Sequence, residues 1–243
     1  MSTAFPDDPA EEAPAPPADF RRVAPLWGWL RGLLIAYIVV NAVFLVALLV
    51  NIGIWNLADS PEAVEIDLYT VAIFSDALLG LAGIAYFIVF VWCGFLFLRF
   101  THRAMRNLWQ LDAKDVTVPP FWAVAWYFVP IAAFWKPLQA VRQIWRNTDN
   151  FEQPRLARVP ASIGWWWTIW VINSIIGGVS FRIGMSSGFY TTDGYIDPAT
   201  VQVMNLLDSI TTALEIPLAM LALSFMGRIA RMQDERFYMV RQF

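Results

Sequence analysis

Four long apolar runs, each poor in charged residues, follow one another along the chain. Each approaches the roughly 20 residues that an α-helix needs to cross a hydrocarbon core of about 30 Å. The first two runs contain no charged residue, whereas the fourth contains Asp208 and Glu215. The pattern predicts an all-α integral membrane protein with four transmembrane helices, at about residues 32–55, 77–98, 159–181 and 205–227.

A fifth charge-free run, residues 116–135, contains Pro119, Pro120 and Pro130, and proline breaks a helix. Basic residues concentrate on the cytoplasmic side of membrane proteins. With four spans, all seventeen Lys and Arg residues except Arg182 fall on one side, whereas a fifth span divides them almost evenly. The charges favour four spans plus an interfacial or re-entrant Trp/Pro-rich segment on the cytoplasmic side. Five transmembrane helices are the alternative.

The chain divides into a membrane domain between two cytoplasmic tails. Residues 1–30 begin with a tract of Pro, Ala and acids that has little to pack, so we expect a disordered tail. The membrane domain covers residues 31–232 with the interfacial segment at 116–148, and residues 233–243 form the second tail. The composition fits a bilayer, because only 15% of the residues are charged, against about 25% in soluble domains.

Within the interfacial segment, residues 136–148 have apolar and polar positions at helical spacing. Such an amphipathic helix can lie in the membrane plane, with basic side chains toward anionic headgroups. We favour this anchoring over the alternative, a linker that packs on the bundle. The candidate contacts to lipid or to a partner are Lys136, Arg142, Trp145 and Arg146.

Glu215 lies near the middle of the fourth run, where a charge costs at least about 2.5 kcal/mol unless it is compensated. Asn41 and Asn173 lie at comparable depth in other runs, so an Asn–Glu hydrogen bond is expected. Asp208 lies two turns before Glu215, and Asp76 lies near the outer end of the second run. These residues form a candidate polar cluster. We favour bonding between helices over a proton or cation path, because few polar steps continue past Glu215.

Small residues recur four apart in the third run, at Ser174 and Gly178. This spacing allows the close approach of a neighbouring helix. Arg182, the lone basic residue of the outer side, is expected to pair with Asp208 or to face outer headgroups.

The sequence offers no recognisable catalytic or metal site. Cys93 is the only cysteine and His102 the only histidine, so no Cys-rich or His-pair metal motif exists. Asp112 and Asp115 lie in a basic loop, where solvated charges are more common than a catalytic pair. No phosphate-binding loop or dinucleotide motif occurs. We therefore expect no cofactor, and the basic loops follow from topology rather than nucleic-acid binding.

The stretch FVPI at 128–131, followed by WKPLQ at 135–139, IWR at 144–146 and a Trp-rich helix, resembles the domain-of-unknown-function 4328 family. The resemblance implies a bacterial cytoplasmic membrane protein of the multi-pass type and brings no activity with it. Pro130 and Pro137 break the helix where the chain must turn. The motif positions that enter as candidates are Pro130, Trp135, Pro137 and Gln139.

Three functions follow as hypotheses. We favour a non-enzymatic scaffold or accessory protein that binds anionic inner-leaflet lipid, with a homo-oligomer or another membrane protein as a further partner. The second hypothesis is a small transporter or channel subunit that uses Glu215. The third is a membrane enzyme acting on lipid through His102, Asp112 or Asp115, which lacks a visible nucleophile–base pair.

Overall fold

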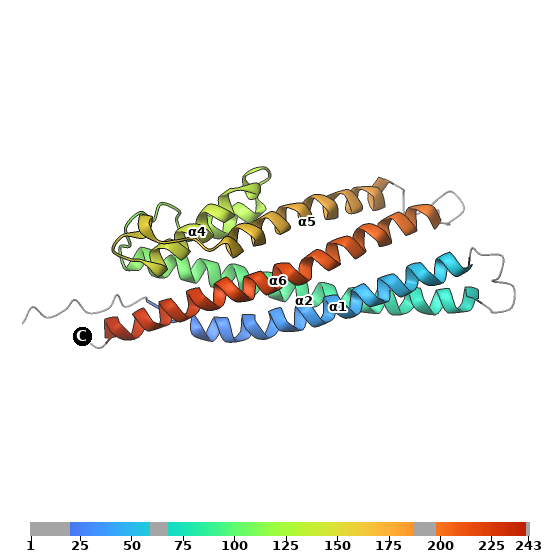
Figure 1. The fold of residues 1–243 in the computed structure, drawn as a ribbon, viewed down its shortest axis with the longest axis horizontal. Helices are drawn as coiled ribbons and strands as arrows, with labels where there is room; N and C mark the ends of the chain where they lie inside the picture. The colour runs from blue at the N-terminus through green and yellow to red at the C-terminus, as the bar shows by residue number, and fades with distance from the viewer. Residues whose placement is uncertain (1–19, 59–67, 187–197, 242–243) are drawn as a thin grey trace, which may run out of the picture.

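The computed structural model describes residues 20–58, 68–186 and 198–241, which contain helices, turns and loops but no strand (Figure 1). Four helices are long, and shorter elements lie between the second and the third. In chain order the elements are α1 (Ala24–Ala58), α2 (Leu68–Gln110), α3 (Trp122–Ala125), the 3-10 turns η2 (Trp126–Phe128) and η3 (Ala132–Phe134), α4 (Lys136–Asp149), the 3-10 turn η4 (Pro154–Leu156), α5 (Ala161–Ser186) and α6 (Pro198–Arg241).

The helices α1, α2, α5 and α6 are long and apolar enough to cross a membrane, which confirms the predicted all-α architecture with four spans. They contain 35, 43, 26 and 44 residues. At 1.5 Å per residue, α2 and α6 are about 65 Å long, about twice the thickness of a hydrocarbon core. These two helices therefore extend well beyond the membrane.

Residues 116–135 form only the four-residue helix α3 and the three-residue turns η2 and η3. A span needs about 20 helical residues, so no helix in this segment can cross the membrane. The alternative of five transmembrane helices is wrong. Pro119 and Pro120 precede α3, and Pro130 separates η2 from η3, as expected of a residue that cannot continue a helix.

Several predicted boundaries are wrong because the helices continue past their apolar runs. α1 begins at Ala24 rather than near residue 32, so residues 20–30 are not part of a disordered tail; residues 1–19 lie outside the described part. α6 continues through most of the predicted tail at 233–243. The extensions are stable as helices because they bury side chains against one another, among them Leu30 and Ile229.

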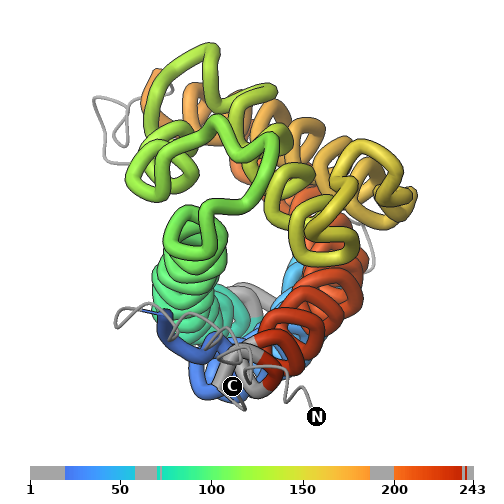
Figure 2. Tube along the Cα trace, turned by 90° about the vertical axis from the view of Figure 1, so that its left-hand side faces the viewer, coloured from blue at the N-terminus to red at the C-terminus, as the bar shows by residue number. Residues whose placement is uncertain are grey.

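The four long helices pack in an open row rather than a closed bundle. α1 packs on α2 and on α6, and α6 packs on α5. α2 and α5 therefore lie at the two ends of the row, and the view along the bundle shows α2 at the left and α5 along the top (Figure 2). The segment from α3 to η3 lies between these two ends.

At one end of the bundle, α1 begins, α2 and α6 end, and α4 packs on them (Figure 1); we call it the α4 end. Buried polar side chains hold it together. Gln233 of α6 donates to the backbone carbonyl of Ala104 and to the hydroxyl of Thr148, both at 3.2 Å. Asn107 donates to Gln233 at 3.2 Å, so α2, α4 and α6 share one hydrogen-bonded network.

The closest helix contact at a glycine involves Gly227 rather than the small residues of α5. A Cβ at Gly227 would lie 2.9 Å from the Trp27 ring, whose edge packs against Phe100. A Cβ at Gly178 would meet nothing within 4 Å. The prediction that Ser174 and Gly178 support close helix packing is therefore wrong, because that face of α5 is exposed.

Gly227→Ala should destabilise the crossing of α1 and α6, because the Trp27 ring must move from its position against Phe100. Overpacking of this kind costs about 1–3 kcal/mol. Thermal unfolding in mild detergent should show a lowered midpoint. Gly178→Ala is the matched control, and we expect it to leave the midpoint unchanged or raise it slightly. Equal midpoints for Gly227→Ala and the unsubstituted protein would contradict this packing.

Candidate functional site

Glu215 of α6 is the centre of a polar network that reaches all four long helices. Its carboxylate is 6% exposed and accepts hydrogen bonds from three neutral side chains. Tyr37 of α1 donates at 2.6 Å, the Tyr86 hydroxyl of α2 lies 2.9 Å from both carboxylate oxygens, and Asn173 of α5 donates at 3.3 Å. The predicted Asn–Glu bond thus forms with Asn173, and the two tyrosines are partners that the sequence analysis missed.

The other predicted members of the polar cluster do not reach Glu215. Asn41 donates to the backbone carbonyl of Tyr37 at 2.7 Å, within its own helix. Asp208 accepts a hydrogen bond from Ser180 at 2.8 Å. Of the two alternatives for Arg182, the pairing with Asp208 does not occur among the described residues, and the Arg182 side chain is exposed.

Asp76 belongs to a separate group near the far end of the bundle. It accepts a hydrogen bond from Asn51 at 2.7 Å, and Asn51 accepts one from Asn205 at 3.0 Å. The single cluster expected from the sequence is therefore divided into layers at different depths. Helix rotation excludes Asn41 from the Glu215 network, because residues of similar depth meet only where they face the same interface.

An apolar groove lies between α2 and α5, next to the Glu215 network. Its volume is about 530 Å³, and its lining includes Tyr37, Phe97, Tyr127, Trp166 and Trp170. α2 and α5 are at the ends of the helix row. Beside the groove they are linked through Glu215, which is bonded to Tyr86 and Asn173, and by the contact of Phe97 with Trp166, whose ring centres lie 5.6 Å apart. The hydroxyl of Tyr127 is buried there without a partner among the described residues. Such a group normally has a hydrogen-bond partner.

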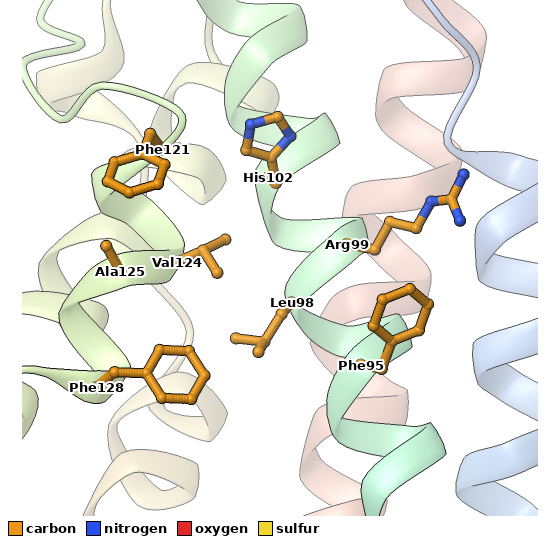
Figure 3. A pocket seen from close by; sticks show the side chains of 8 residues that line it. All are labelled: Phe95, Leu98, Arg99, His102, Phe121, Val124, Ala125 and Phe128. Atoms are coloured by element: carbon orange, nitrogen blue, oxygen red, sulfur yellow. The ribbon is translucent and has the colours of Figure 1, made fainter.

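A second apolar pocket, of about 460 Å³, continues from the groove along α2 (Figure 3). Phe95, Leu98 and Phe128 line both spaces. In Figure 3, Phe121, Val124, Ala125 and Phe128 form one wall, and side chains of α2 form the other. Arg99 and His102 lie where the apolar run of α2 ends, so this pocket has a basic margin.

Helix α4 has the predicted position in the sequence but not the predicted environment. It runs from Lys136 to Asp149, and its apolar side chains, including Ile144 and Trp145, are buried against the bundle. Trp145 is 1% exposed, donates to the carbonyl of Arg158 at 2.9 Å and carries the Arg228 guanidinium over its ring. The prediction of Trp145 as a lipid contact is wrong, because packing on the helix extensions covers it.

The remaining α4 candidates lie at the surface to different degrees. Arg142 and Arg146 are exposed, and Lys136 is half-buried with its ammonium 5.6 Å from the centre of the Trp126 ring. Among the motif positions, Gln139 is exposed and Pro137 is buried in the first turn of α4.

The FVPI motif forms a strained turn between η2 and η3. Ile131 has φ 66° and ψ −58°, and the amide of Ala132 donates to the carbonyl of Pro130 at 2.7 Å. This is the γ-turn with positive φ, which is rare, and a β-branched residue rarely occupies it. The turn leaves Ile131 70% exposed and Trp135 44% exposed.

The residues proposed for an enzyme site do not come together. Asp115 has φ 62° and accepts two hydrogen bonds from Arg155, at 3.0 and 2.9 Å, which hold the pKa of the Asp115 carboxyl below its usual value. This ion pair joins the loop after α2 to η4. His102 instead lies among arginines of α2, in a small pocket lined by Arg99, Arg103 and Arg106.

Comparison with known proteins gives a family but no close relative. A family model described as "Domain of unknown function (DUF4328)" matches residues 62–231. The match covers α2 and α5 completely and α6 up to residue 231, together with the whole segment from α3 to α4. No curated protein and no solved structure matches the chain.

Glu215→Leu should destabilise the protein by about 1–3 kcal/mol, because it leaves the buried hydroxyls of Tyr37 and Tyr86 without their acceptor. Glu215→Gln retains one carbonyl oxygen and should cost less. Thermal unfolding in detergent measures both, with the exposed Ser224→Ala on the same helix as the control. In a double-mutant cycle, Tyr37→Phe and Glu215→Leu should be non-additive. Additive changes in the free energy of unfolding would show that the hydrogen bond between Tyr37 and Glu215 contributes nothing to stability.

Proposed function

We propose that this protein, which belongs to the domain-of-unknown-function 4328 family, is a non-enzymatic scaffold or accessory protein that associates with anionic lipid in a bacterial cytoplasmic membrane. In this proposal the α4 end faces the cytoplasm, and the chain termini lie on that side. The observation that carries it is charge placement. The described basic residues of α2, α4 and α6 belong to the α4 end, and Arg182 near the end of α5 lies at the opposite one.

Exposed aromatic side chains of the α3–η3 segment support lipid contact at this end. Phe121 and Phe128 are 67% and 72% exposed. Aromatic side chains are enriched at the membrane interface, and basic residues near the surface of an anionic leaflet contribute about 1 kcal/mol each. The exposed Arg142 and Arg146 of α4 are the basic groups to which we assign contact with headgroups or a partner.

Two observations favour this proposal over the alternatives. The donors to Glu215 are all neutral, and the groove beside it is lined mainly by apolar and aromatic side chains. Few polar side chains are therefore available along a route that a proton or cation would take to Glu215. Asp115 is engaged by Arg155, so the pair with Asp112 offers no free carboxylate dyad. The assignment as a scaffold or accessory protein rests on these arguments together with the basic surface.

Brominated lipids quench the protein's tryptophans and therefore report which lipid surrounds it. In vesicles that mix phosphatidylglycerol and phosphatidylcholine, brominated phosphatidylglycerol should quench the tryptophan fluorescence more strongly than its fraction of the vesicle lipid predicts. Arg142→Gln/Arg146→Gln should reduce this preference several-fold, since each lost charge removes up to about 1 kcal/mol of attraction. High salt should weaken the preference of the unsubstituted protein.

Arg182→Gln, at the end of the bundle opposite the α4 end, is the control for the loss of a positive charge. It should leave the preference for phosphatidylglycerol in the leaflet at the α4 end unchanged. In oriented proteoliposomes, quenching from the leaflet at the α4 end should respond to the α4 substitutions. An unchanged preference in the double variant would contradict the assignment of α4.

A further inference from the structure

Arg99, His102, Arg103 and Arg106 lie on one face of α2, because positions i, i+3, i+4 and i+7 share a side of a helix. We call this set the α2 stripe. Together with Arg21 and Asn107 it lines a pocket of about 100 Å³. None of these lining residues is acidic. Among the residues that the structure describes, Arg99 and Arg103 form no ion pair, and guanidinium groups crowded together repel one another, so this part of the stripe favours a bound anion.

The segment before α1 is held in a position that adds Arg21 to this pocket. Asn107, which is 2% exposed, donates to the carbonyl of Arg21 at 2.9 Å and accepts from its amide at 3.3 Å. Arg103 donates to the carbonyl of Arg22 at 3.3 Å. A guanidinium has five N–H donors, so this one bond leaves Arg103 further donors for a ligand. The pocket is thus built by contacts between α2 and a distant part of the chain.

The stripe begins where the apolar part of α2 ends. The charge-free run 77–98 is about 33 Å long as a helix, which matches a hydrocarbon core, and Arg99 follows it directly. The stripe therefore lies at the depth of lipid headgroups. A soluble anion could reach this depth, but the neighbouring spaces favour an amphiphile.

The basic pocket and the apolar pocket of Figure 3 share Arg99 and His102 in their linings. Figure 3 shows the Arg99 guanidinium directed away from the apolar side, toward α1. The apolar pocket in turn shares Phe95, Leu98 and Phe128 with the groove between α2 and α5. A basic site, an apolar pocket and an apolar groove thus follow one another along α2. The two apolar volumes, about 460 and 530 Å³, lie in the range of small-molecule sites, about 300–1,000 Å³.

We propose that these adjoining spaces bind one anionic phospholipid, with its phosphate on Arg99 and Arg103 of the α2 stripe and an acyl chain in the apolar pocket between α2 and α3. Arginine suits this role because its planar group donates paired hydrogen bonds to phosphate oxygens. The inference rests on the proposed association with anionic lipid and assigns that association a specific site.

Native mass spectrometry of the full chain, released from detergent with added phosphatidylglycerol or phosphatidylcholine, tests the site. The unsubstituted protein should retain one phosphatidylglycerol in preference to phosphatidylcholine. Arg99→Gln/Arg103→Gln should lower retention of phosphatidylglycerol at least tenfold, and Arg99→Lys/Arg103→Lys should restore part of it. Ala125→Phe, which narrows the apolar pocket, should lower retention of both lipids. Unfolding midpoints without lipid identify a variant that has lost its fold.

Retention unaffected by Arg99→Gln/Arg103→Gln would overturn the site. Competition by millimolar inorganic phosphate would overturn the lipid assignment, because it would show that the pocket takes a free anion. The α4 pair separates the two proposals. If Arg142→Gln/Arg146→Gln retains the lipid but lacks the preference in vesicles, both proposals stand. If it retains both properties, only the role of α4 fails.

Discussion

The buried carboxylate of Glu215 is the constraint on which this architecture depends. Tyr37, Tyr86 and Asn173 come from three different helices and converge on one side chain of a fourth. Without such partners, a carboxylate at this depth would be unfavourable by several kcal/mol. We infer that the network sets the spacing of α2 and α5 together with the contact of Phe97 on Trp166, because both link the two ends of the helix row.

The spacing of α2 and α5 explains the groove and its relation to lipid. The helix extensions and α4 form a packed end with its own core, which holds the α2 stripe beside the α3 segment. The strained turn at Ile131 directs an exposed apolar side chain outward from the same segment. The proposed lipid site is thus formed where a wide interface between helices meets a folded end rich in basic residues.

Much of the fold could be predicted from hydrophobic runs and charge bias, because span length and topology are one-dimensional properties. The partners of Glu215 could be predicted only in part. Depth along a helix suggested both Asn41 and Asn173, but only helix rotation decides that Asn173 reaches the carboxylate. A tyrosine inside an apolar run fits the hydrophobic pattern, so the sequence did not indicate that Tyr86 bonds to Glu215. For α4, the amphipathic pattern could not show whether lipid or protein covers Trp145.

Distance measurement between spin labels on α2 and α5 tests the central claim most directly. Labels at Ile84→Cys and Ile172→Cys, on a Cys93→Ala background, occupy exposed positions on the two helices. The account predicts one narrow distance distribution, which becomes broader or longer when Glu215→Leu removes the shared acceptor. An unchanged distribution in Glu215→Leu would contradict the claim that this carboxylate sets the spacing of α2 and α5.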